Sequence, residues 1–452
     1  MLFNTPQFFL FLLVTLGLFH TAPRQWRKPL LLAASYWFYM SWNWRFAPLL
    51  LTLTAIDYTA ARWIEATADA RRRKLLLIVS IAANLGFLGF FKYYNFLAGN
   101  AAAMLGRPES AFALKIVLPL GISFHTFQSI SYVVDVYRRQ QAAIRSVVDY
   151  ALFIAFFPQL VAGPIVRAHE FFKDLYAWRA PSGEEFNRGA LLVLFGLTKK
   201  MALADPFSVI ADRYFGSLAA HPGVLTAWSG VLAFAVQIYF DFSGYTDMAI
   251  GMALLMGFHF PLNFRLPYLA SGITEFWRRW HMSLSSWLRD YLYIALGGNR
   301  QGRLRTYLNL MATMLLGGLW HGANWKFVVW GGYHGALLGA ERAAVLRIPR
   351  VITFVVVSIG WVFFRAASLQ DSVTVIGRMF WGPRGALLWE RWQIDLILGT
   401  LTLAILEEKL EWFERLVKAP AWVYGAAMAF LLLGIELIGV TEVAVPFVYF
   451  QF

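Results

Sequence analysis

Long hydrophobic stretches, separated by short polar segments, follow one another along almost the whole chain. A helix that crosses the hydrocarbon core of a membrane needs about 20 mainly apolar residues, and most of these stretches approach that length. The pattern predicts an all-α polytopic integral membrane protein. Because no repeat, low-complexity tract or Ser/Pro-rich linker interrupts it, residues 1–452 are expected to form one integrated membrane domain. The candidate spans are 5–20, 29–62, 75–98, 112–136, 147–166, 187–205, 224–258, 304–320, 324–342, 351–366, 394–408 and 421–440.

The stretch 29–62 is too long for a single span. At about 1.5 Å per residue it would cover about 50 Å, against a hydrocarbon core of about 30 Å. Basic clusters flank it on both sides, within residues 21–28 and 63–74. Because cytoplasmic loops carry an excess of Lys and Arg, two short spans that turn at residues 41–44 would leave both clusters in the cytoplasm. We therefore predict a hairpin.

Two further apolar stretches do not correspond simply to one membrane span each. Residues 224–258 also exceed one span, which predicts either two segments or one long tilted helix broken near Ser243 and Gly244. The apolar stretch Met1–His20 has no basic segment before it and no small-residue cleavage site after it. We expect it to be a retained first membrane segment rather than a cleaved signal.

The polar region 259–303 differs from the rest of the chain. Thr274 is expected to cap a helix whose first turn carries Glu275, near the positive end of the helix dipole. Helical spacing would gather aromatic and aliphatic residues on one face of that helix. These residues are Trp277, Trp280, His281, Leu284 and Leu288. Three arginines lie on its other faces, at Arg278, Arg279 and Arg289. A helix with this charge is expected to lie at the membrane interface or dip into the protein.

Composition agrees with a chain that is partly solvated by lipid. Hydrophobic residues make up 59% and charged residues 15%, whereas soluble domains average about 45–50% and about 25%. The formal charge of +14 fits either basic cytoplasmic loops or an anionic substrate such as an acyl-CoA. Nucleic-acid binding would require a basic solvated domain, and the sequence pattern indicates none. The absence of cysteine excludes disulfides, thiolate zinc sites and a cysteine nucleophile.

Histidines are the main candidates for chemistry, because ionisable residues inside membrane segments are costly and often functional. His321 stands out: it lies between two apolar stretches, close to Gly317, Gly318 and Gly322. These glycines would allow a close helix approach or a backbone distortion beside the ring. A hydrogen-bonded structural histidine is an equal alternative at this stage. His334 lies in the following stretch.

The other histidines carry less weight. His125 falls within a span, where it would line a polar interior or serve a structural role. His259 precedes a proline-containing turn and is expected at the interface. His20, His169 and His221 lie at segment ends or in polar loops, as solvated surface histidines do.

Several common catalytic motifs are absent from the sequence, including G-x-S-x-G, H-E-x-x-H, the P-loop and G-x-G-x-x-G. The scattered histidines lack the spacing of metal ligands, so no metal is expected. What remains is a histidine base: burial favours the neutral imidazole, which can accept a hydroxyl proton while the oxygen attacks a thioester carbonyl. Asp241 and Asp247 would orient a histidine, line a polar path, or form buried pairs with Lys or Arg.

Taken together, several segments resemble the membrane-bound O-acyltransferase family. The resemblance is strongest to the bacterial branch that contains the alginate O-acetylation membrane protein and the D-alanyl transfer protein of teichoic acid synthesis. The segments are 91–96 (FKYYNF), 121–124 (GISF), 131–138 (SYVVDVYR), 157–165 (FPQLVAGPI), 241–247 (DFSGYTD), 275–285 (EFWRRWHMSLS), 289–294 (RDYLYI), 296–300 (LGGNR), 318–322 (GLWHG) and 449–452 (YFQF).

The resemblance implies about 11 transmembrane helices, with shorter re-entrant or interfacial helices, around a central tunnel. It identifies His321 with the family's catalytic histidine and His281 with its second characteristic polar position. Other residues of these segments are expected to bind substrate or line the tunnel. They are Asp241, Asp247, Trp277, Arg278, Trp320 and Asn324.

The expected function is that of a multi-pass O-acyltransferase of the bacterial inner membrane. It would move an acyl group, acetyl above all, from a cytoplasmic thioester toward an exported polysaccharide, directly or through a periplasmic acetyltransferase partner. Acetyl-CoA would be the donor, no cofactor would be permanently bound, and membrane lipid would surround the chain. The alternatives are a transporter, or a scaffold of a polysaccharide-export complex, without acyl-transfer chemistry.

Overall fold

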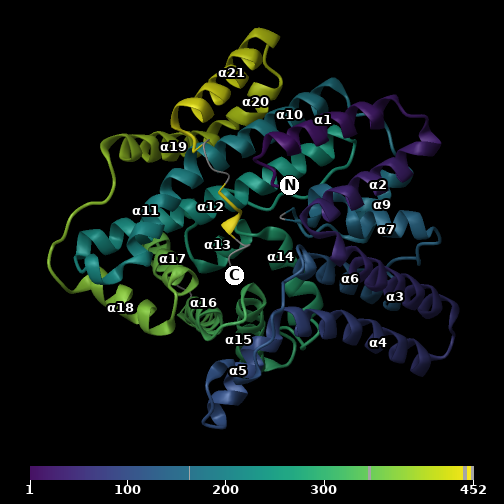
Figure 1. Ribbon diagram of the computed structural model, residues 1–452, viewed down its shortest axis with the longest axis horizontal. Helices are drawn as coiled ribbons and strands as arrows, with labels where there is room; N and C mark the ends of the chain where they lie inside the picture. The colour runs from purple at the N-terminus through teal and green to yellow at the C-terminus, as the bar shows by residue number, and fades with distance from the viewer. Residues whose placement is uncertain (162, 345–347, 441–444, 449–452) are drawn as a thin grey trace. The chain divides into compact units, whose positions relative to one another are not determined.

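The computed structural model describes residues 1–161, 163–344, 348–440 and 445–448; the predicted motif 449–452 lies outside them, as does Ala162. Every regular element of the described residues is helical, as the hydrophobic pattern predicted (Figure 1). The chain forms two compact units. The first holds Met1–Gly189 and Ala249–Pro261, and the second holds Ala190–Met248 and Leu262–Phe452. That they form one integrated domain stays a prediction.

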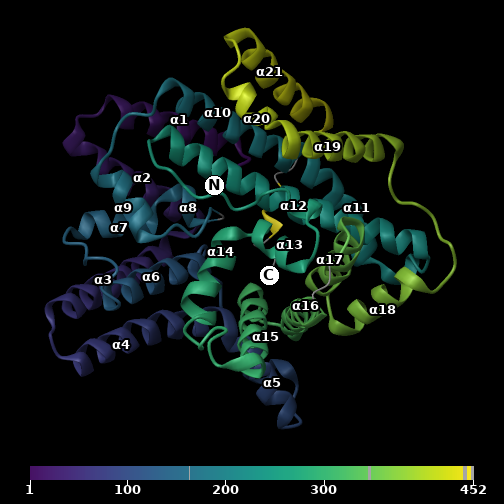
Figure 2. The same ribbon diagram turned by 180° about the vertical axis from the view of Figure 1, so that it is seen from behind.

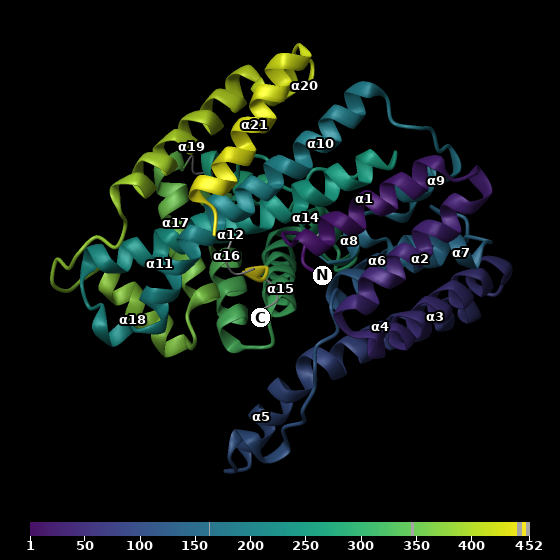
Figure 3. The same ribbon diagram turned by 45° about the horizontal axis from the view of Figure 1, so that its top comes forward.

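The first unit contains nine α-helices among its described residues. They are α1 (Pro6–Thr21), α2 (Arg24–Asn43), α3 (Ala47–Ala66), α4 (Ala70–Leu88), α5 (Tyr94–Met104), α6 (Ile122–Tyr137), α7 (Val147–Ala155), α8 (Phe157–Leu160) and α9 (Ala168–Tyr176). Short 3-10 turns cover Trp44–Phe46 and Glu109–Phe112. A π-helical turn joins α4 to α5, so the two form one long rod (Figure 3).

A buried polar cluster holds α3 against α4. The Asp57 carboxylate on α3 accepts a hydrogen bond from the Ser80 hydroxyl at 2.6 Å and another from the Asn84 amide at 2.8 Å, both on α4. All three side chains are fully buried. Because buried polar groups are costly unless they are paired, these bonds fix which faces of the two helices meet. The helices lie side by side in Figures 1 and 2.

The second unit holds the remaining helices. Two helices, α10 (Gly183–Thr198) and α12 (Val224–Leu255), contribute residues to both units. The others are α11 (Asp205–Gly216), α13 (Ile273–Arg279), α14 (Met282–Trp287), α15 (Gly302–His321), α16 (Trp325–Ala344), α17 (Arg350–Arg365), α18 (Leu369–Phe380), α19 (Arg391–Leu410), α20 (Trp412–Val417) and α21 (Ala421–Ile438). π-helical turns cover Lys199–Ala204 and Leu288–Tyr293, and 3-10 turns cover Leu218–Ala220 and Pro267–Leu269.

The predicted break of 224–258 near Ser243 and Gly244 is wrong, because α12 runs without interruption through both residues. The glycine serves packing instead. A Cβ on Gly244 would come within 2.6 Å of the Gly196 carbonyl oxygen, and a Cβ on Gly196 within 2.4 Å of the Gly244 oxygen. The pair of glycines therefore lets α10 and α12 approach backbone to backbone, as small residues do in membrane bundles.

The predicted break of the stretch 29–62 is confirmed. Helix α2 ends at Asn43, and a 3-10 turn leads into α3 at Ala47. Asn43 has an extended backbone, and its side-chain oxygen accepts a hydrogen bond from the Arg45 N–H at 3.1 Å. An asparagine that caps the following turn in this way competes with helix continuation, which explains why α2 ends here.

The sidedness of this hairpin is a prediction that cysteine labelling tests, because the chain has no native cysteine. Gln25→Cys and Ala68→Cys should resist a membrane-impermeant maleimide added outside intact cells, whereas Arg45→Cys at the turn should react. All three positions are exposed in the structure, so burial within the protein would not explain protection. Outside labelling at residue 25 or 68 contradicts the hairpin orientation.

Three helical stretches of the described residues are long and apolar enough to cross a membrane. They are Ala70–Met104, Val224–Leu255 and Ala421–Ile438, and Pro6–Thr21 is a shorter apolar helix. The chain is thus an all-α membrane protein. Several predicted spans form helices that carry polar residues on their buried faces. The count of about 11 spans therefore stays a prediction.

Candidate active site

His321 ends α15 and is only 5% exposed. Aromatic rings surround its imidazole, with centroids at 5.0 Å for Trp320, 5.1 Å for Trp330 and 5.3 Å for Phe364. These three rings come from α15, α16 and α17, which lie next to one another in Figures 1 and 2. The histidine predicted from its apolar surroundings is therefore buried in an aromatic pocket of the second unit.

Glycines bring α15 and α16 together at this histidine. A Cβ on Gly318 would lie 2.2 Å from the Phe327 carbonyl oxygen, and a Cβ on Gly331 would lie 2.3 Å from that of Met314. A Cβ on Gly322, directly after the histidine, would enter the Phe327 ring, with 2.0 Å to its nearest atom. The close helix approach predicted from the glycines is confirmed, and any larger residue at these positions would push the two helices apart.

His281 does not lie within a continuous helix, so the predicted amphipathic helix over 274–291 is wrong. Helix α13 ends at Arg279, and His281 has the left-handed backbone angle φ +43° before α14 begins at Met282. A non-glycine residue in this conformation is uncommon and marks a position that surrounding contacts hold in place. The side chain itself is 1% exposed, as expected for a residue that faces the protein interior.

Thr274 is not the cap of this helix, which is a second correction. The helix is preceded by Gly272, and the Glu341 carboxylate at the end of α16 accepts the backbone N–H groups of Ile273 at 2.6 Å and Thr274 at 3.2 Å. A carboxylate satisfies the free donors of a helix start better than a hydroxyl does. Glu275 does occupy the first turn as predicted, and it pairs with Arg279 at 2.5 Å.

Asn263 holds the break at His281. Its side-chain oxygen accepts hydrogen bonds from the Ser283 N–H at 3.2 Å and the Ser283 hydroxyl at 2.9 Å, and its carbonyl oxygen accepts the Met282 N–H at 2.9 Å. Asn263 is fully buried. The start of α14 is therefore tied to the loop before α13, and this tie fixes the direction in which His281 points.

Both histidine rings lie near the Trp320 ring. The His281 ring is 4.7 Å from the Phe242 ring and 6.3 Å from Trp320, whose ring is 5.0 Å from His321. Trp320 is 6% exposed. The structure thus brings together three of the residues that the sequence singled out, and leaves their roles in catalysis as a prediction.

The aromatic pocket continues past His321 to a third imidazole. Trp277 lies 5.6 Å from Trp330 and 5.2 Å from His334, and Trp330 lies 5.0 Å from His334. Neither ring nitrogen of His334 has a hydrogen-bond partner among the described residues, and the side chain is fully buried. Gly360 makes room for this ring, because a Cβ there would lie 2.9 Å from its Nε2. Trp277 therefore lies in the same aromatic cluster, and its role in binding substrate stays a prediction.

Two other predicted site residues have exposed side chains, and whether they bind substrate or line a tunnel stays a prediction. Arg278 is exposed, and so is Asn324. The Asn324 side-chain oxygen accepts the Lys326 N–H at 3.0 Å, just before α16 begins. It therefore caps that helix, which is a structural task and does not place it against the imidazoles.

The two predicted aspartates form ion pairs with consecutive lysines of the π-helical turn Lys199–Ala204. Asp247 pairs with Lys199 at 2.6 Å, and Asp241 pairs with Lys200 at 2.8 Å. Lys200 also pairs with Asp205 at 2.6 Å, and this group of three is 1–2% exposed. Of the alternatives left open by the sequence, a pair with lysine is observed for both acids, buried for Asp241 and partly buried for Asp247.

Sequence reasoning missed three polar residues that shape the site: Asn263, Glu341 and Lys326. The Lys326 ammonium donates to the carbonyl oxygens of Phe364 at 3.2 Å and Ala366 at 2.7 Å, at the end of α17. It thus stabilises the helix end that carries one ring of the His321 pocket. The sequence signal for Lys326 was a lysine in an apolar stretch, five residues after the candidate histidine.

His125 lies buried on α6 of the first unit.

Sequence comparison relates this chain to a family of known proteins. Residues 71–367, which include both His281 and His321, match the membrane-bound O-acyltransferase family. The "Probable alginate O-acetylase AlgI" of Pseudomonas putida is 44% identical over 398 residues, covering 84% of this chain and 80% of that protein. The peptidoglycan O-acetyltransferase of Helicobacter pylori is 38% identical over 429 residues, with 84% and 80% covered.

A more distant relative matches over a shorter region. The teichoic acid D-alanyltransferase of Streptococcus thermophilus is 30% identical over 234 residues, covering 48% of this chain and 55% of that protein. The family match spans well over half of the chain, and the two acetylases above cover four fifths of it. The chain therefore belongs to the membrane-bound O-acyltransferase family and is an O-acyltransferase.

Proposed function

We propose that this enzyme moves an acetyl group from cytoplasmic acetyl-CoA across the bacterial inner membrane toward an exported polysaccharide, directly or through a periplasmic partner. The observation that carries the proposal is His321, buried among Trp320, Trp330 and Phe364, with the His281 ring 6.3 Å from Trp320. The relatives named as alginate and peptidoglycan O-acetylases support acetyl as the group and a polysaccharide as the acceptor. Membership of the family favours this enzyme over the transporter and scaffold alternatives.

In the proposed step, a neutral His321 imidazole takes the proton of an acceptor hydroxyl. The hydroxyl oxygen then attacks the thioester carbonyl, a C–O bond forms and the C–S bond breaks. The thiolate that leaves recovers the proton from the imidazolium, so the histidine returns to its starting state. The aromatic walls around His321 exclude water, which disfavours hydrolysis of the thioester.

His281 is assigned a different task. Its ring lies 6.3 Å from Trp320, and Asn263 holds the backbone that follows it, so it would hydrogen-bond and orient the donor or acceptor rather than accept the proton. Trp277 and Trp320 would form part of the wall along which the acyl group lies. Asp241 and Asp247 would support this wall through their lysine pairs on the same unit.

The test uses the purified full-length chain in sealed lipid vesicles, with isotope-labelled acetyl-CoA on one side and polysaccharide or a periplasmic fraction on the other. The expected result is transfer of label to the far side only when the chain is present. A labelled acyl group on a carrier protein serves as the competing donor. Transfer from the carrier but not from acetyl-CoA would overturn the donor, and transfer from neither would overturn the proposed function.

A further inference from the structure

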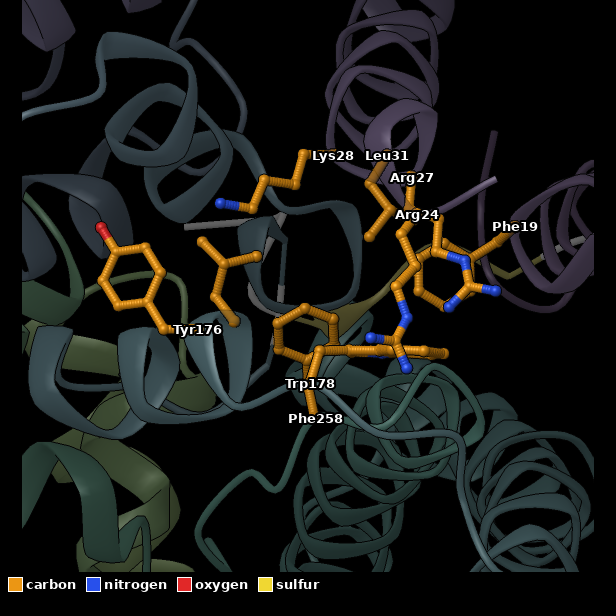
Figure 4. A pocket seen from close by; sticks show the side chains of 9 residues that line it. Phe19, Arg24, Arg27, Lys28, Leu31, Tyr176, Trp178 and Phe258 are labelled. Atoms are coloured by element: carbon orange, nitrogen blue, oxygen red, sulfur yellow. The ribbon is translucent and has the colours of Figure 1, made fainter. Parts of the chain in front are cut away.

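A pocket with a cavity volume of about 190 Å³ lies in the first unit, away from the histidines (Figure 4). It forms where α1 ends, α2 begins and α9 ends. Its floor is aromatic and aliphatic, with Phe19, Leu31, Leu175, Trp178 and Phe258. Three basic side chains, Arg24, Arg27 and Lys28, reach it from the first turns of α2. An apolar floor below a cationic rim suits a ligand with an anionic end and an apolar end.

The three cations are not equivalent. Lys28 is balanced by Asp149, at 2.9 Å. The Arg27 guanidinium lies over the Trp178 ring at 4.1 Å, as Figure 4 shows, and its Nε donates to the Ala22 carbonyl oxygen at 3.0 Å. Its buried Nη1 has no hydrogen-bond partner among the described residues. Within those residues, neither Arg24 nor Arg27 pairs with a carboxylate, so two positive charges at the pocket are left without a counter-charge.

The backbone adds to this positive potential. Helix α2 starts at Arg24, so the partial positive charge of its first turn and its free N–H groups lie at the pocket. Helix starts combined with arginines are common sites for phosphate groups. The rigid stacking of Arg27 on Trp178 also holds one guanidinium in place before any ligand binds, which lowers the entropy cost of binding.

The surroundings favour a lipid over a soluble anion. Helix α1, which leads to the pocket, exposes a row of large apolar side chains, with Leu10 at 66% and Leu13 at 67%. In a membrane protein such a face meets lipid tails. The cavity is also smaller than the roughly 300–1,000 Å³ of sites that enclose a whole small molecule. It would hold a headgroup while the rest of the ligand stays outside.

We propose that this pocket binds the phosphate headgroup of an anionic phospholipid. Arg24 and Arg27 contact the phosphate, Trp178 supports Arg27, and Phe19 and Leu31 contact the glycerol and the upper acyl chain. The predicted cytoplasmic side of residues 21–28 would place the lipid in the inner leaflet. The site does not depend on the acyl-transfer chemistry, so its test is independent of the proposed function.

The test is native mass spectrometry of the purified full-length chain with phosphatidylglycerol and, separately, phosphatidylcholine. One phosphatidylglycerol is expected to bind at least about tenfold more tightly than phosphatidylcholine, because each basic residue contributes to binding an anionic headgroup. The double variant Arg24→Gln/Arg27→Gln should lose this preference. Arg24→Lys/Arg27→Lys, which keeps both charges, should retain most of it.

The matched control removes two charges elsewhere in the same unit. Arg71→Gln/Lys74→Gln changes two exposed residues of α4 that do not line the pocket, and phosphatidylglycerol binding should be unchanged. If the double pocket variant is not monodisperse, Arg24→Gln alone, at an exposed position, should still weaken binding several-fold. The proposal is overturned if the folded Gln variants bind like the parent, or if coenzyme A or inorganic phosphate displaces the lipid.

Discussion

His321→Ala is expected to abolish acyl transfer, with a loss of about 10²–10⁴-fold, the range typical for removal of a general base. The expectation rests on the position of the imidazole, buried at the end of α15 among three aromatic rings. The measurement is label transfer from acetyl-CoA in the vesicle assay, at equal amounts of inserted, folded protein.

A stability control is needed, because alanine at a packed site also leaves a cavity. Buried large-to-small changes commonly cost about 2–5 kcal/mol, which lowers the amount of folded enzyme. His125→Ala provides the comparison: it removes the same buried imidazole from α6 in the first unit, where no catalytic role is assigned. Both variants should unfold at lower temperature, but only His321→Ala should lose transfer per folded molecule. A His321→Ala chain that transfers acetyl at nearly the parent rate would refute the assignment.

The hydrophobic pattern predicted the helices well because it is a local property. Each apolar stretch became one or more helices, and the basic flanks of the stretch 29–62 correctly indicated its break at Asn43. The pattern failed for α12, where Gly244 suggested a break. The glycine faces Gly196 on another helix, and a contact between residues 48 positions apart leaves no trace in the local sequence.

The site was predicted in part for the same reason. His321 could be singled out because its neighbours are apolar, and His281 because of the segment it shares with the family. The break at His281 could not be foreseen, since no glycine or proline marks it. It depends on Asn263, 20 positions from Ser283. The start of α13 likewise depends on Glu341, 67 positions from Thr274. Long-range partners of this kind decide backbone conformation without altering the periodicity of the helix.

The pairing of Asp241 and Asp247 with Lys200 and Lys199 shows a further limit of local reasoning. On an ordinary helix, consecutive lysines point about 100° apart. Here the turn that carries them is π-helical, and both reach carboxylates on α12. A π-turn of this type often lies near a functional site. Both acids form ion pairs, and their part in binding substrate or lining a tunnel stays a prediction.

Replacement of His281 is expected to separate a hydrogen-bonding role from a packing role. His281→Gln should keep a substantial part of the acyl transfer, because its amide can still donate or accept a hydrogen bond. His281→Leu should lose most of it, by about tenfold or more, in line with about 1–3 kcal/mol for a buried polar partner left unsatisfied. The measurement is transfer by both variants at matched expression.

The left-handed backbone at residue 281 has to be separated from the side-chain effect. Gln and Leu are both unbranched at Cβ, so φ +43° should destabilise the two variants to a similar extent. The difference in acyl transfer between them therefore reports the effect of the polar group. His281→Asn adds a second comparison, because asparagine tolerates this conformation better but its shorter side chain holds the amide closer to the backbone than Gln does. The unfolding temperature should therefore be highest in the Asn variant, whereas the acyl-transfer rate should be highest in the Gln variant. Equal, near-normal transfer in Gln and Leu would contradict a role in orienting substrate, and equally severe loss in both, with normal unfolding, would indicate that the imidazole itself takes part in proton transfer.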